Sequence, residues 1–282
     1  MEEILEEQSK QREFSVLMSV YKNTKLSELK ECLDSLENQT VKATEYVIVR
    51  DGQVSSELND YLDSLENDLS GCKIIRLEQN VGLGNALKEG MAHCSNEIIA
   101  RMDTDDICVK NRFEEQLDCF ENDEELSIVG SNIAEFIDSV SNVVSYRNVP
   151  RDHDDICEYL KKRCPFNHMT VMFKKTDVEK AGGYLHWHYN EDSYLWVRMY
   201  LAGAKFYNIQ ENLVCARIDE STFARRGGYK YYKSERDLFK YMYKNKIIGF
   251  GSYVKAKTIR FILYVLMPNR MRQWAYKKFA RK

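Results

Sequence analysis

The chain has 282 residues, of which 44% are hydrophobic and 30% charged, and this composition excludes wholesale disorder. The net charge of −3 gives no overall signal for a nucleic acid or another polyanion as partner. The eight cysteines contain no Cys-x-x-Cys pair, which excludes zinc-ribbon spacing and indicates reduced thiols. No apolar run reaches the roughly 18 residues of a spanning helix, and the first ten residues lack the apolar part of a secretion signal. We therefore expect a cytoplasmic location.

Short apolar runs alternate with leucines at helical spacing through the first hundred residues. After a polar arm at 1–13, this alternation predicts strands buried on both faces and helices between them. The predicted strands lie at 14–20, 45–49, 73–77 and 98–102, and the helices at 26–36, 58–69 and 86–91. Repeated β-α units predict an α/β fold with a mostly parallel central sheet.

The second half of the chain alternates less regularly. A helix is expected around 113–120, another at 154–162 and a third from Glu191 onward. Strands are predicted at 127–134, 142–148, 169–173, 205–209 and 213–217, with His168 at the start of the third of these.

An acidic stretch ends the fourth predicted strand, at Asp103, Asp105 and Asp106. The carboxyl ends of parallel strands form the edge of the sheet at which ligands bind. Asp103 and Asp105 are two residues apart, so on an extended segment their carboxylates point the same way and suit Mg²⁺ or Mn²⁺. The alternative is that Asp105 or Asp106 caps a helix starting near Val109.

The other strands also end in polar or glycine-bearing loops, so several candidate ligand contacts converge at one edge. The loop from Asn80 to Gly84 contains Gly82-x-Gly84 but has Leu87 where a dinucleotide fingerprint needs its third glycine. It also follows the third strand instead of the first, which argues against a nicotinamide-binding fold.

Five stretches in order resemble the family 2 inverting glycosyltransferases of bacteria, which have the GT-A fold, and most of all those that build capsular or exopolysaccharide repeat units. The resemblance covers residues 14 to about 228. The stretches are Ser19-Val20-Tyr21-Lys22-Asn23, Val49-Arg50-Asp51-Gly52, Asn80-x-Gly82-Leu83-x-x-Ala86-Leu87, Arg101-Met102-Asp103-x-Asp105-Asp106 and Asn190-Glu191-Asp192-x-x-Leu195-Trp196-x-Arg198. Where the family often has Asp-Asp-Gly, this chain has Arg50-Asp51-Gly52 and so keeps one acid.

The resemblance implies a site for a nucleotide-sugar. Tyr21 is similar to the residue that stacks on the base, and Asp51 to the carboxylate that accepts a hydrogen bond from uracil. Asp103 and Asp105 match the pair that holds Mn²⁺ or Mg²⁺ on the diphosphate. The nucleotide-sugar-binding residues that it implies are Tyr21, Asn23, Asp51, Asn80, Gly82, Leu83, Arg101, Asp103, Thr104, His168 and Arg226.

An inverting transfer also needs a general base for the acceptor hydroxyl. The resemblance gives this role to Asp192, with Glu191 as the second choice. Without the resemblance, an acidic first turn that stabilises a helix start is the simpler interpretation. His168 has a structural hydrogen bond as its alternative role, and Arg226 a solvated turn.

The last region, 229–282, mixes aromatic and basic residues. The apolar run from Phe261 to Met267 is too short to span a bilayer and suits a helix lying at an anionic membrane surface. The alternative is a helical arm that packs on the catalytic domain or on a second copy of the chain. We therefore expect peripheral contact with the inner face of the cell membrane or a homodimer, and no nucleic acid.

Together these patterns predict an arm at 1–13, a GT-A domain at 14–228 and a C-terminal helical region at 229–282. The expected activity is metal-dependent, inverting transfer of a sugar from a UDP-sugar to a polyprenyl-diphosphate-linked or glycan acceptor, in surface polysaccharide biosynthesis. The alternatives are a sugar-phosphate nucleotidyltransferase and a non-catalytic protein that binds nucleotide-sugar beside another transferase. The first would need a glycine-rich basic loop after the first strand, where this chain has Ser19-Val20-Tyr21-Lys22-Asn23.

Overall fold

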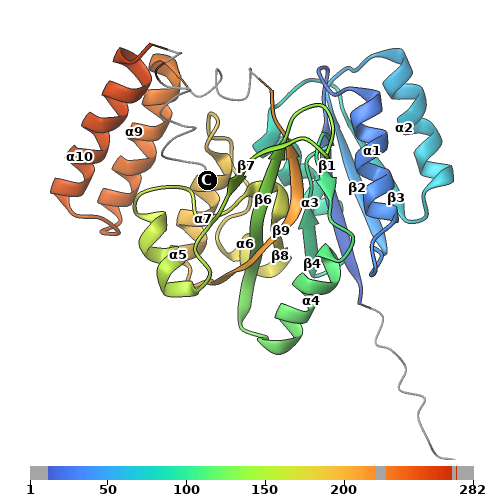
Figure 1. Cartoon of the computed structure of the whole chain (residues 1–282), viewed down its shortest axis with the longest axis horizontal. Helices are drawn as coiled ribbons and strands as arrows, with labels where there is room; N and C mark the ends of the chain where they lie inside the picture. The colour runs from blue at the N-terminus through green and yellow to red at the C-terminus, as the bar shows by residue number, and fades with distance from the viewer. Residues whose placement is uncertain (1–11, 220–226, 269–270, 272–282) are drawn as a thin grey trace, which may run out of the picture.

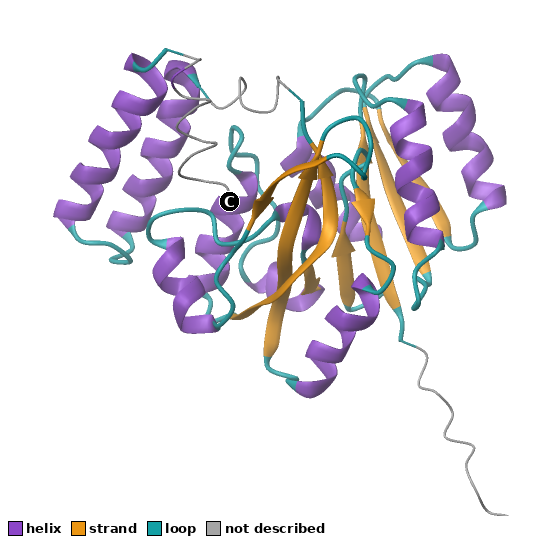
Figure 2. Ribbon diagram, in the orientation of Figure 1, coloured by secondary structure: helices purple, strands orange, loops and turns teal. Residues whose placement is uncertain are grey.

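The computed structural model describes residues 12–219, 227–268 and 271. It has the predicted α/β architecture, with a central sheet between two layers of helices (Figures 1 and 2). The nine strands of the described residues are β1 Phe14–Val20, β2 Glu45–Asp51, β3 Cys72–Leu77, β4 Ile98–Arg101, β5 Ile107–Cys108, β6 Leu126–Phe136, β7 Val143–Arg147, β8 Met172–Lys174 and β9 Lys205–Arg217. The helices are α1 Leu26–Glu37, α2 Ser56–Asp68, α3 Leu83–His93, α4 Arg112–Asn122, α5 His153–Leu160, α6 Lys175–Lys180, α7 Glu191–Leu201, α9 Gly228–Lys244 and α10 Phe250–Phe261, with short turns of helix at His168–Thr170 and Ile262–Leu266.

The strands are ordered β3-β2-β1-β4-β8-β6-β9-β5, and β7 pairs with β6. Strands β3, β2, β1 and β4 are mutually parallel, as the alternation of strands and helices predicts. Their carboxyl ends therefore lie at one edge. Beyond β4, strand β8 runs antiparallel to both β4 and β6, while β6 and β9 are parallel.

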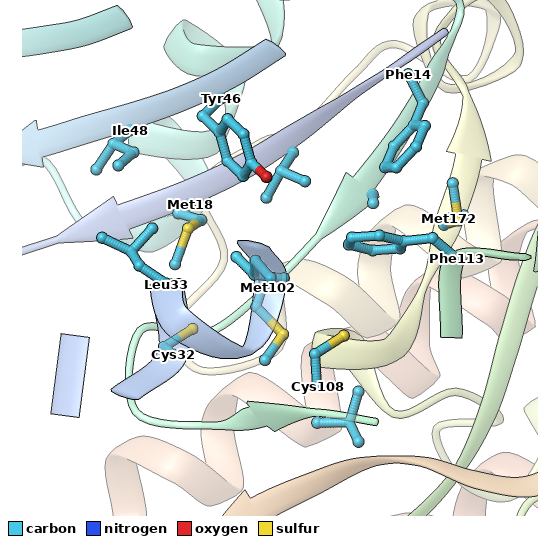
Figure 3. Packing of buried hydrophobic residues seen from close by; sticks show 14 of the residues in the cluster. Phe14, Met18, Cys32, Leu33, Tyr46, Ile48, Met102, Cys108, Phe113 and Met172 are labelled. Atoms are coloured by element: carbon cyan, nitrogen blue, oxygen red, sulfur yellow. The ribbon is translucent and has the colours of Figure 1, made fainter. Parts of the chain in front are cut away.

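Strand β1 shows why its sequence is almost continuously apolar. Phe14, Val16 and Met18 face the core with α1, α2 and α4, whereas Leu17 faces the core with α3, α5 and α7. Figure 3 shows the first of these cores, in which the rings of Phe14 and Phe113 lie edge to face with centroids 4.7 Å apart. Both faces of the strand are thus removed from water, which requires apolar residues at successive positions.

The C-terminal helices α9 and α10 lie side by side, at the opposite end of the molecule from α1 and α2 (Figure 1). Leu238, Phe239 and Met242 of α9 are buried in the same core as α7. Arg260 of α10 donates to Glu235 at 2.6 Å and stacks 3.8 Å from the ring centroid of Phe239. Helix α9 therefore packs as an arm on the α/β body, and α10 covers α9.

Three predicted strands differ in the structure. The strand expected at 169–173 is shorter, because His168–Thr170 form a helical turn in which the Thr170 N–H donates to the Asn167 oxygen at 2.9 Å. Asn167 is fixed by a bond to the Ser131 oxygen at 2.8 Å, a non-local contact that a local pattern does not contain. The strands expected at 205–209 and 213–217 are one strand, β9, whose register to β6 shifts near Asn132.

Candidate active site

The acidic loop between β4 and β5 is anchored in the core at both ends. Met102 and Cys108 flank it and are buried, and Figure 3 shows both side chains pointing toward the core. The Cys32 thiol of α1 donates to the backbone oxygen of Asp103 at 3.2 Å. These contacts hold the intervening residues at the carboxyl edge of the parallel strands.

Three carboxylates of this loop lie together. Asp103, Asp105 and Asp106 each offer an oxygen within 4.8 Å of the others. Desolvation and then the charge of Asp103 raise the pKa of Asp105 to about 6, and burial and then Asp105 raise the pKa of Asp106. The second carboxylate oxygen of Asp106 is buried and has no hydrogen-bond partner among the described residues. Crowded oxygen ligands, one of them unpaired, fit a hard divalent cation.

The alternative role of these acids, capping a helix, is wrong. Helix α4 begins at Arg112 with Asn111 as its N-cap, several residues beyond the loop. Asp106 was not predicted as a ligand, although its position next to Asp105 offered a signal. One of its oxygens accepts the Arg217 N–H of β9 at 2.8 Å, so β9 helps to fix the loop.

Arg101 and Thr104, which are predicted to bind the nucleotide-sugar, are both buried in this structure. Arg101 ends β4 and is only 2% exposed, with its guanidinium paired to Asp103. Both side chains are thus largely enclosed by the protein beside the acidic loop.

The loops after β2 and β3 are joined by Asp51. Its carboxylate accepts the N–H groups of Val81 at 2.7 Å and Gly82 at 3.1 Å, and the side-chain amide of Asn80 at 2.9 Å. Asp51 is 3% exposed, and these three hydrogen bonds fix the shape of the loop that leads into α3. Gly52 assists, because a Cβ there would lie 2.6 Å from the Asn80 nitrogen and its φ is +83°.

Tyr21 and Asn23 follow β1 and are exposed at the same edge. The Tyr21 N–H donates to the Thr24 hydroxyl at 3.0 Å, and the Thr24 N–H returns to the Tyr21 oxygen at 2.9 Å. In this tight turn the Tyr21 side chain is exposed. The structure thus brings Asp51, Asn80 and Gly82 into direct contact and places Tyr21 at the end of the neighbouring strand.

Helix α7 begins with the acid pair Glu191 and Asp192. One oxygen of Asp192 accepts the Ser193 N–H at 2.6 Å, and the other accepts the Cys164 thiol at 3.5 Å. Burial and then the charge of Asp192 raise the pKa of Glu191 to about 7, and Glu191 also interacts electrostatically with Arg101 and Asp103. The start of α7 is therefore within electrostatic range of the acidic loop.

Helix α3 packs on this region, because a Cβ at Gly84 would lie 3.1 Å from the Glu191 Cβ. His168 bonds the Tyr184 hydroxyl at 2.9 Å, and burial and then the Arg101 charge lower the pKa of His168. His168 is neutral and partnered, as its structural alternative predicted. Leu83 opens α3 and is partly buried. Arg226 lies outside the described residues.

No helix within 12–219 and 227–268 is long and apolar enough to cross a bilayer. The α10 face is nevertheless rich in exposed apolar side chains, among them Phe250 at 64% and Leu266, just beyond the helix, at 62%. Lys255 and Lys257 are exposed among them, and residues 238–282 contain no acid.

Comparison with known proteins identifies the family to which the chain belongs. The model of the family "Glycosyl transferase family 2" matches residues 15–179. An uncharacterized glycosyltransferase of Haemophilus influenzae is 42% identical over 95% of this chain and 99% of its own length. A UDP-Gal:alpha-D-GlcNAc-diphosphoundecaprenol beta-1,3-galactosyltransferase of Escherichia coli is 37% identical over 95% of this chain and 97% of its own length.

Among solved structures, S. aureus TarS in complex with UDP-GlcNAc superposes with a TM-score of 0.65 at 14% identity, covering 95% of this chain and 76% of that chain. The mannosyltransferase PcManGT from Pyrobaculum calidifontis, in complex with GDP-Man and Mn2+, gives a TM-score of 0.61 at 13% identity, covering 92% and 71%. The predicted fold is confirmed. The chain is a glycosyltransferase with the GT-A fold and belongs to glycosyl transferase family 2.

Proposed function

We propose that this glycosyltransferase transfers a sugar from a UDP-sugar to the hydroxyl of a lipid-linked or glycan acceptor, with inversion at the anomeric carbon. Two acid groups support the proposal: the Asp103–Asp106 loop at the carboxyl edge of the parallel strands, and the Glu191–Asp192 pair, whose Glu191 packs against the first turn of α3 and interacts electrostatically with Asp103. The relative from Escherichia coli, named for a UDP-galactose donor and a diphosphoundecaprenol-linked acceptor, supports both substrate classes.

On the donor side, Asp103 and Asp105 would hold Mn²⁺ or Mg²⁺, and Asp106 offers a third oxygen. A divalent cation bound there would neutralise negative charge on the diphosphate leaving group. We infer that Tyr21 stacks on the base and that Asn23 lies beside it. Asp51 shapes the loop through which Asn80, Gly82 and Leu83 approach the nucleotide. Arg226 is proposed to reach the diphosphate.

On the acceptor side, a carboxylate at the start of α7 takes the proton. The acceptor hydroxyl oxygen bonds to the anomeric carbon, the bond from that carbon to the diphosphate oxygen breaks, and the hydroxyl proton passes to Asp192. A UDP-α-sugar would give a β-linkage by this single displacement. Glu191 remains the second choice for the base, since it interacts electrostatically with Asp103 and its pKa is raised to about 7 by burial and then by Asp192.

A lipid-linked acceptor would be reached at the inner face of the membrane. We infer that α10 and the turn after it lie on an anionic lipid surface, because they expose Phe250, Val254 and Leu266 beside lysines and carry no acid. Co-sedimentation with vesicles containing phosphatidylglycerol tests this inference. The double variant Phe250→Ser/Leu266→Ser should remain in the supernatant, while self-association without vesicles would indicate a homodimer surface instead.

A donor panel tests the reaction. UDP- and GDP-sugars are incubated with Mn²⁺ or Mg²⁺, and free nucleoside diphosphate is scored for the wild type, Asp105→Ala and Asp192→Asn. Cation-dependent UDP release from one sugar, lost in Asp105→Ala, is the expected result. Full transfer activity in Asp192→Asn would refute its role as base. Incorporation of a sugar phosphate into nucleotide would instead support a nucleotidyltransferase, and UDP binding without release in the presence of acceptor would support a non-catalytic partner.

A further inference from the structure

Arg101 is a buried arginine whose guanidinium bonds a carboxylate of the acidic loop. Its exposed fraction is 2%, and one terminal nitrogen donates to one oxygen of Asp103. Its other two guanidinium nitrogens have no hydrogen-bond partner among the described residues. Burying a guanidinium costs several kcal/mol unless nearby anions compensate its charge. The neighbouring carboxylates therefore allow the positively charged Arg101 side chain to be buried here.

The backbone of Arg101 is as constrained as its side chain. Its N–H donates to the Val171 oxygen at 2.9 Å, and its oxygen accepts from the Arg112 guanidinium at 2.8 Å. The residue is therefore fixed at the end of β4, between β8 and α4. With the backbone fixed and the side chain only 2% exposed, the guanidinium contacts Asp103 from an enclosed position.

A carboxylate has two oxygens, and Arg101 occupies one oxygen of Asp103. Asp103 is about one-third exposed, so it keeps open surface beside the bond to Arg101. Partners that fix the orientation of a metal ligand typically change metal affinity 10- to 100-fold when removed. Arg101, which the sequence analysis predicts to bind the nucleotide-sugar, is therefore well placed to fix the orientation of Asp103.

We propose that Arg101 is a positioning residue for the divalent-cation site, which holds one oxygen of Asp103 so that the other faces the cation. The inference rests on the proposed function, because it assumes that Asp103 binds a cation. It replaces direct contact between Arg101 and the nucleotide. Arg101 also places a positive charge directly on Asp103, so Asp103 keeps its orientation before a cation arrives.

The test is Mn²⁺ binding, followed by electron paramagnetic resonance of free Mn²⁺, with and without UDP. Arg101→Met should weaken Mn²⁺ binding by about 10-fold or more, and Arg101→Lys, which keeps the charge, should weaken it less. Arg198→Met is the matched control. Arg198 is 8% exposed and donates to the backbone oxygens of Ala181 and Gly183 at 2.6 and 2.7 Å. Its loss should lower stability and leave Mn²⁺ affinity within twofold.

A folded Arg101→Met protein that binds Mn²⁺ as tightly as the wild type, or more tightly, overturns the inference, since Arg101 would then be a bystander or a competitor. If this variant does not fold, a crystal structure of the wild type with Mn²⁺ and UDP decides. Arg101 still bonded to Asp103 beside the ion supports positioning, and Arg101 turned away refutes it. A wild type that binds no Mn²⁺ would instead refute the metal-dependent function itself.

Discussion

Replacing Asp51 with alanine should disorganise the loop that leads into α3. The carboxylate accepts three hydrogen bonds, from the N–H groups of Val81 and Gly82 and from the Asn80 side chain. A hydrogen bond to a charged group contributes about 1.5–3 kcal/mol. Water can reach the partly exposed Val81 and Gly82 in the variant and recover much of this. We therefore expect a net loss of about 2–3 kcal/mol, within the usual range for one broken network.

The assay pairs urea unfolding with calorimetric titration of UDP and CDP. If Asp51 shapes the loop, Asp51→Ala lowers stability and weakens binding of both nucleotides alike. If Asp51 only reads uracil, stability stays at the wild-type value and UDP binding alone falls. Tyr21→Ala is the control, because Tyr21 is 38% exposed and its loss should weaken both nucleotides without a change in stability. Wild-type stability in Asp51→Ala would refute the reasoning from these three bonds.

Three further predictions concern acids and glycines. A general base must be deprotonated to act, and burial and then Asp192 raise the pKa of Glu191 to about 7. If Glu191 is the base that limits the reaction, kcat should therefore rise with pH through about 7. Glu191→Gln should remove this rise, and an unchanged pH profile in the variant would exclude Glu191 as the base. Around Glu45, hydrogen-bond donors outweigh burial and lower its pKa from 4.5 to about 2, so the stability that Glu45 contributes is complete above pH 4.5 and is lost as the pH falls toward 2. Urea unfolding of Glu45→Gln between pH 2 and 6 should show a shallower dependence of the free energy of unfolding on pH than the wild type. An equal slope for the two proteins would count against this prediction. Gly52→Ala should lower the free energy of unfolding by about 2–4 kcal/mol, because its Cβ would lie 2.6 Å from the Asn80 backbone. Gly203→Ala, with φ +81° but no atom within 4 Å of the added Cβ, should lower it by only about 1 kcal/mol through backbone strain. Equal melting temperatures for the two variants would refute the steric argument.

The elements that the sequence predicts well are those whose pattern is local. Strand β1 is predicted because both of its faces are buried, which leaves an unbroken apolar run. The turn at His168–Thr170 is missed because its cause is non-local: Asn167 bonds the distant Ser131 oxygen and holds the chain in a turn. The apolar residues that follow then read as a longer strand than the structure has.

In the candidate active site too, features set by local sequence are predicted and features set by distant contacts are not. The acidic loop and the acid pair on α7 are short motifs, and their residues lie where parallel strands and a helix start place them. The side-chain environment of Arg101 is not in any motif. A charged residue at a strand end suggests solvent or a ligand, and only the packing of β4 between β1 and β8 shows that this guanidinium points inward. The task of Asp51, to shape a loop distant in sequence, is hidden for the same reason.

The charges around Arg101 explain why the two acid groups need different support. Asp103, Asp105 and Asp106 bring three acids together in one loop, beside the guanidinium of Arg101, which pairs with Asp103, and that of Arg217, which donates to the Asp105 backbone oxygen at 3.1 Å. The pair at the start of α7 has instead the helix N-terminus, whose partial positive charge stabilises carboxylates in the first turn. One group is thus completed by an added cation and the other by the fold. That difference fits the proposed donor site, which must offset a diphosphate, and the proposed acceptor site, which must hold a carboxylate in position to accept a proton.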